Sequence, residues 1–170
     1  MSRQWGHENR EDLAGEHPFG DAGQIILLII FLIVWVFDSF ILRFSTLLAQ
    51  YVSLSIRIPL GLLFLAAAVY FAKEGMRIVF GEERKEPAVI RAGVFNRVRH
   101  PIYLGCVLFY FGLLTFTLSI FSGVLCAVIV VFYHVISRYE ERLLISKFGK
   151  EYEDYIKSVP MWFPRFRSTQ

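Results

Sequence analysis

Long apolar segments limit what this chain can fold into more than any other feature does. A helix needs about 20 mostly apolar residues to cross the roughly 30 Å of hydrocarbon in a bilayer. Of the 170 residues, 55% are hydrophobic and 16% are aromatic, which is too apolar for an ordinary soluble domain. Segments of this kind cover residues 25–42, 54–72, 101–118 and 119–136. The sequence therefore predicts an all-α integral membrane protein with about four transmembrane helices.

The third and fourth apolar segments follow one another almost without interruption, and the few small polar residues between them gather near Leu118. We predict a tight helical hairpin that turns there. If its two helices are antiparallel about this point, Tyr103 lies level with His134, and Arg97 lies level with Glu140. Polar residues that are distant in the sequence would then meet at one face of the membrane.

The basic residues are concentrated in two places, which predicts how the chain is oriented. Seven Lys and Arg residues fall between positions 73 and 99, and seven follow position 136. The positive-inside rule places both groups in the cytoplasm. Both termini are then cytoplasmic, with residues 1–24 forming a polar tail and residues 25–170 a single membrane domain. The tail lacks the pattern of a removable signal peptide, so the first span is expected to act as the targeting signal.

Residues 138–170 are expected to form a cytoplasmic amphipathic helix and tail. Apolar residues recur there at helical spacing from Leu143 to Val159, with an interruption at Gly149 and with lysines outside the apolar stripe. Such a helix can lie back on the membrane or on the spans. It serves either as an anchor or as a lid over a site. The residues that follow span two, up to Gly81, are expected to continue that helix for about two turns.

A basic loop leads directly into the third apolar segment at Arg97 to Gly105. Pro101 suits the first position of a helix, so His100 is expected at the cap. The first N–H groups of a helix and the positive end of its dipole attract anions. Arg99 and His100 would add positive charge, and Tyr103 lies in the next turn. This junction is the predicted site, at the cytoplasmic membrane face.

The fourth segment carries a second polar group that should face the junction. His134, Arg138 and Glu141 share a helix face by their spacing, and Glu140 lies beside them. Polar side chains on apolar helices are costly unless they face a cavity. Such a site suits a zwitterionic ligand with a carboxylate and a cation. A purely structural network of ion pairs is the alternative interpretation.

Two other groups are interpreted as structural. Asp38, an acid inside the first segment, lies close in sequence to Arg43 and is expected to pair with that residue or with Arg57. Cys106 and Cys126 lie inside apolar segments at no metal-ligand or redox spacing, so they are expected to be packed thiols and no metal site is predicted.

Several blocks of the C-terminal half resemble a known family. They are the 93–105 block GVFNRVRHPIYLG, the Glu140-Glu141 pair, the pattern from Phe148 to Tyr155, and Val159-Pro160. Together they resemble the isoprenylcysteine carboxyl methyltransferase and phospholipid methyltransferase family, whose members are small membrane enzymes that use S-adenosylmethionine. Family members often have Gly-Pro-Tyr where this chain has Gly93-Val94-Phe95.

The resemblance implies which residues form the site. It implies that His100, Tyr103, Leu104, Glu140 and Glu141 hold S-adenosylmethionine, and that the segment from Val89 to Phe95 lines the adenosine. Together with the helix start, the candidate cofactor-binding residues are Val89, Ile90, Gly93, Arg99, His100, Tyr103, Leu104, Glu140 and Glu141. The candidate catalytic residues are Arg138, which would hold an anionic acceptor, and Glu141, which with His134 is a candidate base if the acceptor is an ammonium.

The expected reaction is methyl transfer to a lipophilic acceptor that enters from the bilayer, for example an isoprenylcysteine carboxylate, a phospholipid amine or a thiol. Membrane lipids are the expected surroundings and no nucleic acid is expected, while the acceptor and the oligomeric state are left open. Two alternatives remain. Sterol reductases, which use NADPH, end in a tail resembling Lys147-Phe148-Gly149 and Val159-Pro160, and a non-catalytic membrane protein could keep the same architecture.

Overall fold

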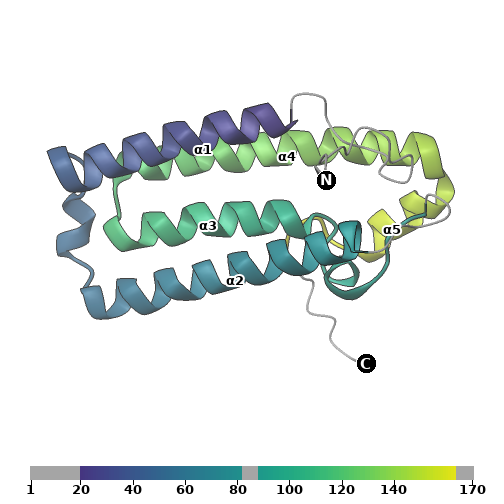
Figure 1. Cartoon of the computed structure of the whole chain (residues 1–170), viewed down its shortest axis with the longest axis horizontal. Coiled ribbons are helices and arrows are strands. Elements are labelled where there is room, and N and C mark those ends of the chain that lie inside the picture. The colour runs from purple at the N-terminus through teal and green to yellow at the C-terminus, as the bar shows by residue number, and fades with distance from the viewer. Residues whose placement is uncertain (1–19, 82–87, 164–170) are drawn as a thin grey trace, which may run out of the picture.

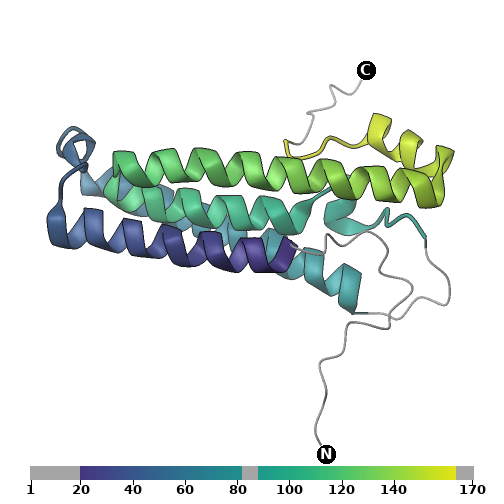
Figure 2. The same cartoon turned by 90° about the horizontal axis from the view of Figure 1, so that it is seen from above.

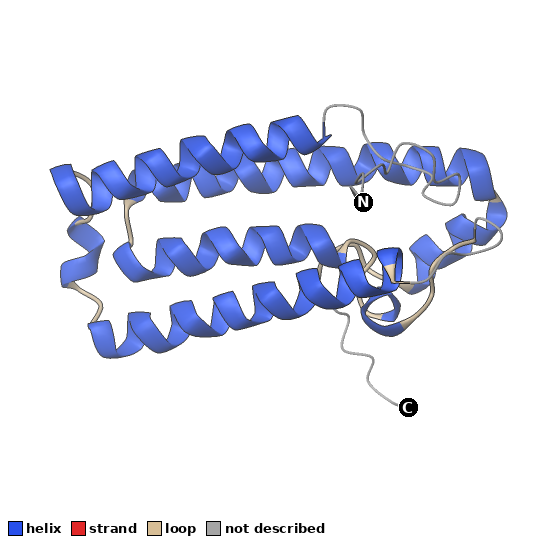
Figure 3. Cartoon of the chain, in the orientation of Figure 1, coloured by secondary structure: helices blue, strands red, loops and turns tan. Residues whose placement is uncertain are grey.

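The computed structural model describes residues 20–81 and 88–163. Within these ranges the regular structure is helical, with no β-strand (Figure 3). Four long helices run side by side, with α1 next to α4 and α2 next to α3 (Figure 1). Their bounds are Gly20–Val36 (α1), Leu54–Phe80 (α2), Pro101–Thr117 (α3) and Ile120–Phe148 (α4). This arrangement confirms the predicted all-α architecture.

Among the described residues, three stretches are long and apolar enough to cross a bilayer, namely Ala22–Leu42, Leu54–Phe80 and Ile120–Phe148. The first joins α1 to a π-helical turn, η1 (Phe37–Leu42). The 17 residues of α3 are also apolar, but at 1.5 Å per residue they reach only about 25 Å. By length and composition this is an integral membrane protein with three candidate spans. The fourth predicted span, α3, stays a prediction.

The predicted hairpin lies where the sequence places it. Leu118 ends α3 in the left-handed region, with φ 49°. Ser119 then caps α4, because its hydroxyl oxygen accepts a hydrogen bond from the backbone N–H of Ser122 at 3.1 Å. Leu54–Phe80 is likewise one helix, so the extension of α2 to Gly81 is confirmed.

The fourth predicted span, 119–136, lies inside a longer helix that includes its predicted extension. Between Val124 and Phe148 the sequence has neither Gly nor Pro, so nothing interrupts the backbone hydrogen bonds and α4 continues to Phe148. The break comes at Gly149, with φ 53°. The short helix α5 (Lys150–Ser158) follows, and the chain turns back beside the end of α4 (Figure 2).

Helices α2 and α3 approach closely because small residues meet there. A Cβ atom added to Gly105 would lie 2.9 Å from the carbonyl oxygen of Ala68 and 3.0 Å from the backbone nitrogen of Ala72. Only glycine fits at that point without a shift of backbone. On the other side of α3, the main core joins α1, α3, α4 and the tail through Phe31, Tyr110, Ile129, Tyr133 and Trp162.

The predicted ion pair of Asp38 with an arginine is wrong. The Asp38 carboxylate accepts hydrogen bonds from the backbone N–H and the hydroxyl of Ser45 and from the hydroxyl of Ser119. Arg57 donates instead to the carbonyl oxygen of Phe116 at 2.7 Å. Asp38 therefore ties the end of α1 to the α3–α4 turn through neutral donors, which the spacing of charges does not reveal.

Candidate functional site

The start of α3 is built as predicted, with His100 at the cap and Pro101 in the first turn. The C-terminal segment holds this junction in place. The backbone N–H of Arg99 donates to the carbonyl oxygen of Pro160 at 3.0 Å, and that of His100 donates to Met161 at 3.4 Å. Two residues that begin the site are thus anchored by a segment about 60 positions later in the chain.

Arg99 forms a buried ion pair with Glu141. Its Nε lies 2.7 Å from Glu141 Oε1, and the two side chains are 7% and 3% exposed. The guanidinium also donates to the carbonyl oxygens of Ile156 and Val159. Glu141 and these two carbonyls accept hydrogen bonds from the Arg99 guanidinium. These contacts hold the start of α3, the end of α4 and the C-terminal segment together.

His100 lies between two carboxylates. Its Nε2 is 3.3 Å from Glu141 Oε1, and its Nδ1 is 3.7 Å from Glu140 Oε2. Of the two ring nitrogens only Nε2 lies within hydrogen-bond distance of a carboxylate, so we assign the proton to Nε2, as a donor to Glu141. Burial lowers the pKa of His100 below its ordinary value of 6.5, and the hydrogen bond with Glu141 opposes this only in part. Burial therefore favours the neutral form of the imidazole.

Tyr103 connects the two polar groups. Its ring stacks on His100, with centroids 5.7 Å apart, and its hydroxyl donates to Glu140. The predicted neighbour, His134, is exposed. The ring does contact Tyr133, at 5.3 Å, which agrees with the predicted helix register. Side chains of α3 lean toward its N-terminus, so the hydroxyl reaches past that level to Glu140.

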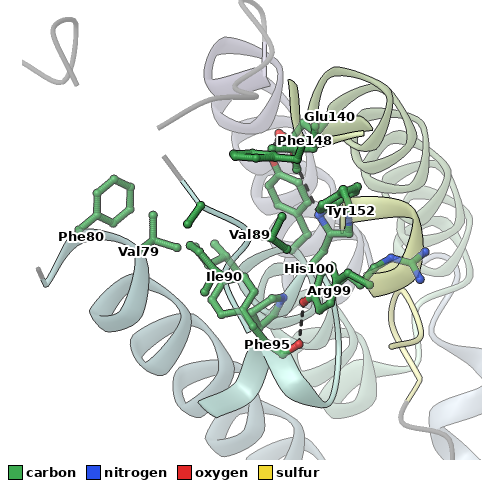
Figure 4. A pocket seen from close by; sticks show the side chains of 16 residues that line it. Val79, Phe80, Val89, Ile90, Phe95, Arg99, His100, Glu140, Phe148 and Tyr152 are labelled. Carbon is green, nitrogen blue, oxygen red and sulfur yellow. Dashed lines mark hydrogen bonds and ion pairs between the residues drawn. The ribbon is translucent and has the colours of Figure 1, made fainter. Parts of the chain in front are cut away.

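A cavity of about 220 Å³ opens between these elements (Figure 4). The end of α2 and the following loop form an apolar wall, and α4 and α5 form an aromatic one. Its lining residues are Val79, Phe80, Ala88, Val89, Ile90, Phe95, Arg99, His100, Pro101, Ile102, Tyr103, Glu140, Leu144, Phe148, Tyr152 and Tyr155. Arg99, His100 and Glu140 share this wall with many apolar and aromatic side chains, as is typical of small-molecule sites.

The structure brings six of the predicted cofactor-binding residues to the cavity wall. They are Val89, Ile90, Arg99, His100, Tyr103 and Glu140. The four other predicted site residues lie outside the wall. Gly93 is exposed in a 3-10 turn with φ 51°, and Leu104 is buried against neighbouring helices. Glu141 is buried behind Arg99 and His100, and the side chain of Arg138 is 56% exposed and 3.5 Å from Glu141.

Aromatic residues of the C-terminal segment complete the wall. The sequence predicted this segment as an anchor or a lid, but it assigned none of these residues individually to the site. Phe148, Tyr152 and Tyr155 belong to the apolar stripe that predicted an amphipathic helix. Burial raises the pKa of the Tyr155 phenol, which donates to the carbonyl oxygen of Phe95 at 2.6 Å. That bond fixes α5 against the loop before α3. The helical spacing of the apolar residues indicated that one face of this helix is buried. It did not indicate which part of the chain covers that face.

Comparison with known proteins shows similarity to methyltransferases and to metal-resistance proteins. The chain is 27% identical to methanethiol S-methyltransferase of Crocosphaera subtropica over 143 residues, 84% of this chain and 48% of that protein. It is 29% identical to protein-S-isoprenylcysteine O-methyltransferase of Schizosaccharomyces pombe over 100 residues, 58% of this chain and 42% of that protein. It is 32% identical to cobalt-zinc-cadmium resistance protein CzcN of Cupriavidus metallidurans over 83 residues, 48% and 38% of the two chains.

The chain thus spans less than half the length of these curated relatives. No solved structure matches it. The family model described as phospholipid methyltransferase matches residues 46–151, more than half of the chain. This range includes the start of α3 and the Glu140-Glu141 pair. Taken with the helical membrane architecture and the cavity at the start of α3, this match shows that the chain belongs to the phospholipid methyltransferase family.

Proposed function

We propose that this chain transfers a methyl group from S-adenosylmethionine to a lipophilic acceptor at the cytoplasmic face of the membrane. The observation that carries the proposal is the placing of Glu140 and His100 together on the wall of an otherwise largely apolar cavity. S-adenosylmethionine combines a carboxylate, an ammonium, a sulfonium and an adenosine, so a suitable site needs groups for opposite charges and an apolar wall. The donor set present here fits those needs.

Each part of the wall has a role in this proposal. Glu140 and the neutral His100 accept hydrogen bonds, so a ligand ammonium can donate to them. The start of α3 attracts a carboxylate. Val89, Ile90 and Phe95 provide an apolar surface for a flat ring system, and the absence of a tyrosine at position 95 leaves that surface without a hydroxyl.

When bound, S-adenosylmethionine supplies a methyl group that is already activated by the sulfonium. The residues of the chain then have to orient the reactants and exclude water. Positioning of this kind can be worth about 7 to 11 kcal/mol of the barrier. Phe148 and Tyr152 cover the cavity and restrict water, while Tyr103 holds the Glu140 carboxylate in place.

The candidate catalytic residues lie beside the wall. Glu141 is engaged with Arg99 and His100, which favours a positioning role, because it fixes the imidazole orientation. Arg138 is accessible and touches Glu141, so it stays a candidate for binding an anionic acceptor.

The cytoplasmic location rests on charge. The two groups of basic residues flank the start of α3 and the end of α4, where the cavity lies. The acceptor would come from the bilayer because apolar helices surround the site. Two relatives are named for methanethiol and for protein-S-isoprenylcysteine, so a thiol and a prenylated cysteine are the first acceptors to test.

Isothermal titration of the detergent-purified protein tests the cofactor. We expect binding of S-adenosylmethionine and of its demethylated product, but not of NADPH. Glu140→Gln should weaken binding by about tenfold or more, since a hydrogen bond to a charged group contributes about 1.5 to 3 kcal/mol. Glu153→Gln, an equal change on the exposed face of α5, is the matched control. Binding of NADPH alone, or no binding of any of the three, would refute the proposal.

A further inference from the structure

One wall of the cavity is a short loop, residues 88–92, that has no regular secondary structure. Ala88, Val89 and Ile90 of this loop line the cavity (Figure 4). Among the backbone hydrogen bonds between described residues outside the helices, none involves positions 88–91. Helices keep their shape through their own backbone hydrogen bonds, but this wall has to be held in place by side chains.

Arg91 provides the polar part of that attachment, and both of its partners belong to α5. Its Nη2 donates a hydrogen bond to the carbonyl oxygen of Glu151 at 2.7 Å. Its guanidinium carbon lies 5.4 Å from the centroid of the Tyr155 ring, within the range of a cation–π contact. The loop is therefore joined to α5 by the residue that directly follows Val89 and Ile90.

Tyr155 ties the same segment to α5 a second time. Its hydroxyl donates to the carbonyl oxygen of Phe95 at 2.6 Å, while its ring faces the Arg91 guanidinium. Val89 packs against the apolar cluster that contains Tyr155. The stretch from Val89 to Phe95 thus contacts one helix at both of its ends and at Arg91.

We infer that Arg91 is a positioning residue for the methyl donor, because it holds the 88–92 loop against α5 and so keeps the apolar wall in place for the adenosine ring system. The inference rests on the proposed function, in which Val89, Ile90 and Phe95 provide that apolar surface. A wall that is already ordered before binding spares the ligand the cost of ordering it. Without Arg91, the ligand would have to order the loop as it binds.

Titration with two ligands tests this role, because they share the adenosine and differ in the rest. S-adenosylmethionine carries an ammonium and a carboxylate, and 5′-methylthioadenosine has neither. Arg91→Ala should weaken the binding of both ligands to the detergent-purified protein by about threefold to tenfold, through loss of one cation–π contact and one hydrogen bond. Glu140→Gln should weaken only the binding of S-adenosylmethionine, since the other ligand has no ammonium to donate to residue 140.

Two further variants control the measurement. Arg142→Ala removes an exposed arginine of α4 that does not line the cavity, so both affinities should stay at the wild-type value. Arg91→Lys keeps a positive charge that can lie over the Tyr155 ring and donate to Glu151, so it should recover a large part of the affinity for both ligands. Without ligand, Arg91→Ala should melt within about 2 °C of Arg142→Ala.

Four results would overturn the inference while the proposed function stands. The first is equal affinity of Arg91→Ala and Arg142→Ala for both ligands. The second is a loss for S-adenosylmethionine alone in Arg91→Ala, which would place the effect at the charged end of the donor. The third is a wild-type protein that binds S-adenosylmethionine but not 5′-methylthioadenosine. The fourth is a larger drop in melting temperature, which would show that Arg91 stabilises the whole fold. If the wild-type protein binds no S-adenosylmethionine, the proposed function itself fails.

Discussion

Glu141→Gln removes the negative partner of the buried Arg99 guanidinium and keeps the size of the side chain. Breaking a buried pair from one side costs about 3 to 5 kcal/mol, because an uncompensated charge is left out of water. Two backbone carbonyls still accept from Arg99, and the new amide oxygen can accept from Nε. We therefore expect the lower end, a loss of about 3 kcal/mol in the free energy of unfolding.

For a chain of this size, 1 kcal/mol moves the melting temperature by about 2 to 4 °C, so the expected loss is about 6 to 12 °C. Thermal denaturation in detergent, followed by intrinsic fluorescence, measures it. Asp154→Asn is the control, because that residue pairs with Lys157 at the surface, where such a pair contributes about 0 to 1 kcal/mol.

A double variant separates the lost pair from a general loss of packing. Arg99→Met combined with Glu141→Leu removes both charges, and an apolar replacement of a buried pair is often neutral or stabilising. The double variant also loses the hydrogen bonds from Arg99 to the Ile156 and Val159 carbonyls and from His100 to residue 141. It leaves no uncompensated charge, however, so it should melt above Glu141→Gln. If Glu141→Gln melts within about 2 °C of Asp154→Asn, the buried pair does not hold the site together as argued here.

Three further outcomes follow from the described contacts. The pKa of His100 is lowered in the folded state, so below about pH 6.5 the unfolded chain binds a proton that the folded chain does not. The free energy of unfolding should therefore fall as the pH drops from 7.5 to 5.5. Melting curves of His100→Gln should show a weaker dependence on pH. Gly105→Ala should cost about 1 to 3 kcal/mol by overpacking, whereas Gly123→Ala, whose nearest neighbour is 3.9 Å away, should not. Tyr103→Phe should weaken S-adenosylmethionine binding in calorimetry, since the hydrogen bond that holds the Glu140 carboxylate is lost; unchanged affinity would show that this bond does not shape the site.

Local patterns in the sequence predicted the helices and the start of the site. The apolar runs, the His100-Pro101 step and the turn at Leu118 each depend on a few neighbouring residues, and the structure has all three. The helix register was also right, since Tyr103 contacts Tyr133. No partner was predicted for the Tyr103 hydroxyl, because that partner depends on which way a long side chain leans.

Other contacts between distant segments could not be predicted. Nothing in Pro160 and Met161 indicates that their carbonyls accept from Arg99 and His100, because backbone groups carry no sequence signature. Asp38 shows the same limit. Its partners are Ser45 and Ser119, which the loops bring close to the carboxylate. The charges in the sequence suggested an arginine instead.

The attachment of the C-terminal segment to the start of α3 also determines when the site can form during synthesis of the chain. Arg99 is separated by 60 residues from Val159, whose carbonyl it binds. At synthesis rates of about 5 to 20 residues per second, these residues take roughly 3 to 12 s to follow. During that interval the start of α3 has left the ribosome tunnel ahead of the segment that anchors it. The site is therefore assembled last, after the helices around it are already made.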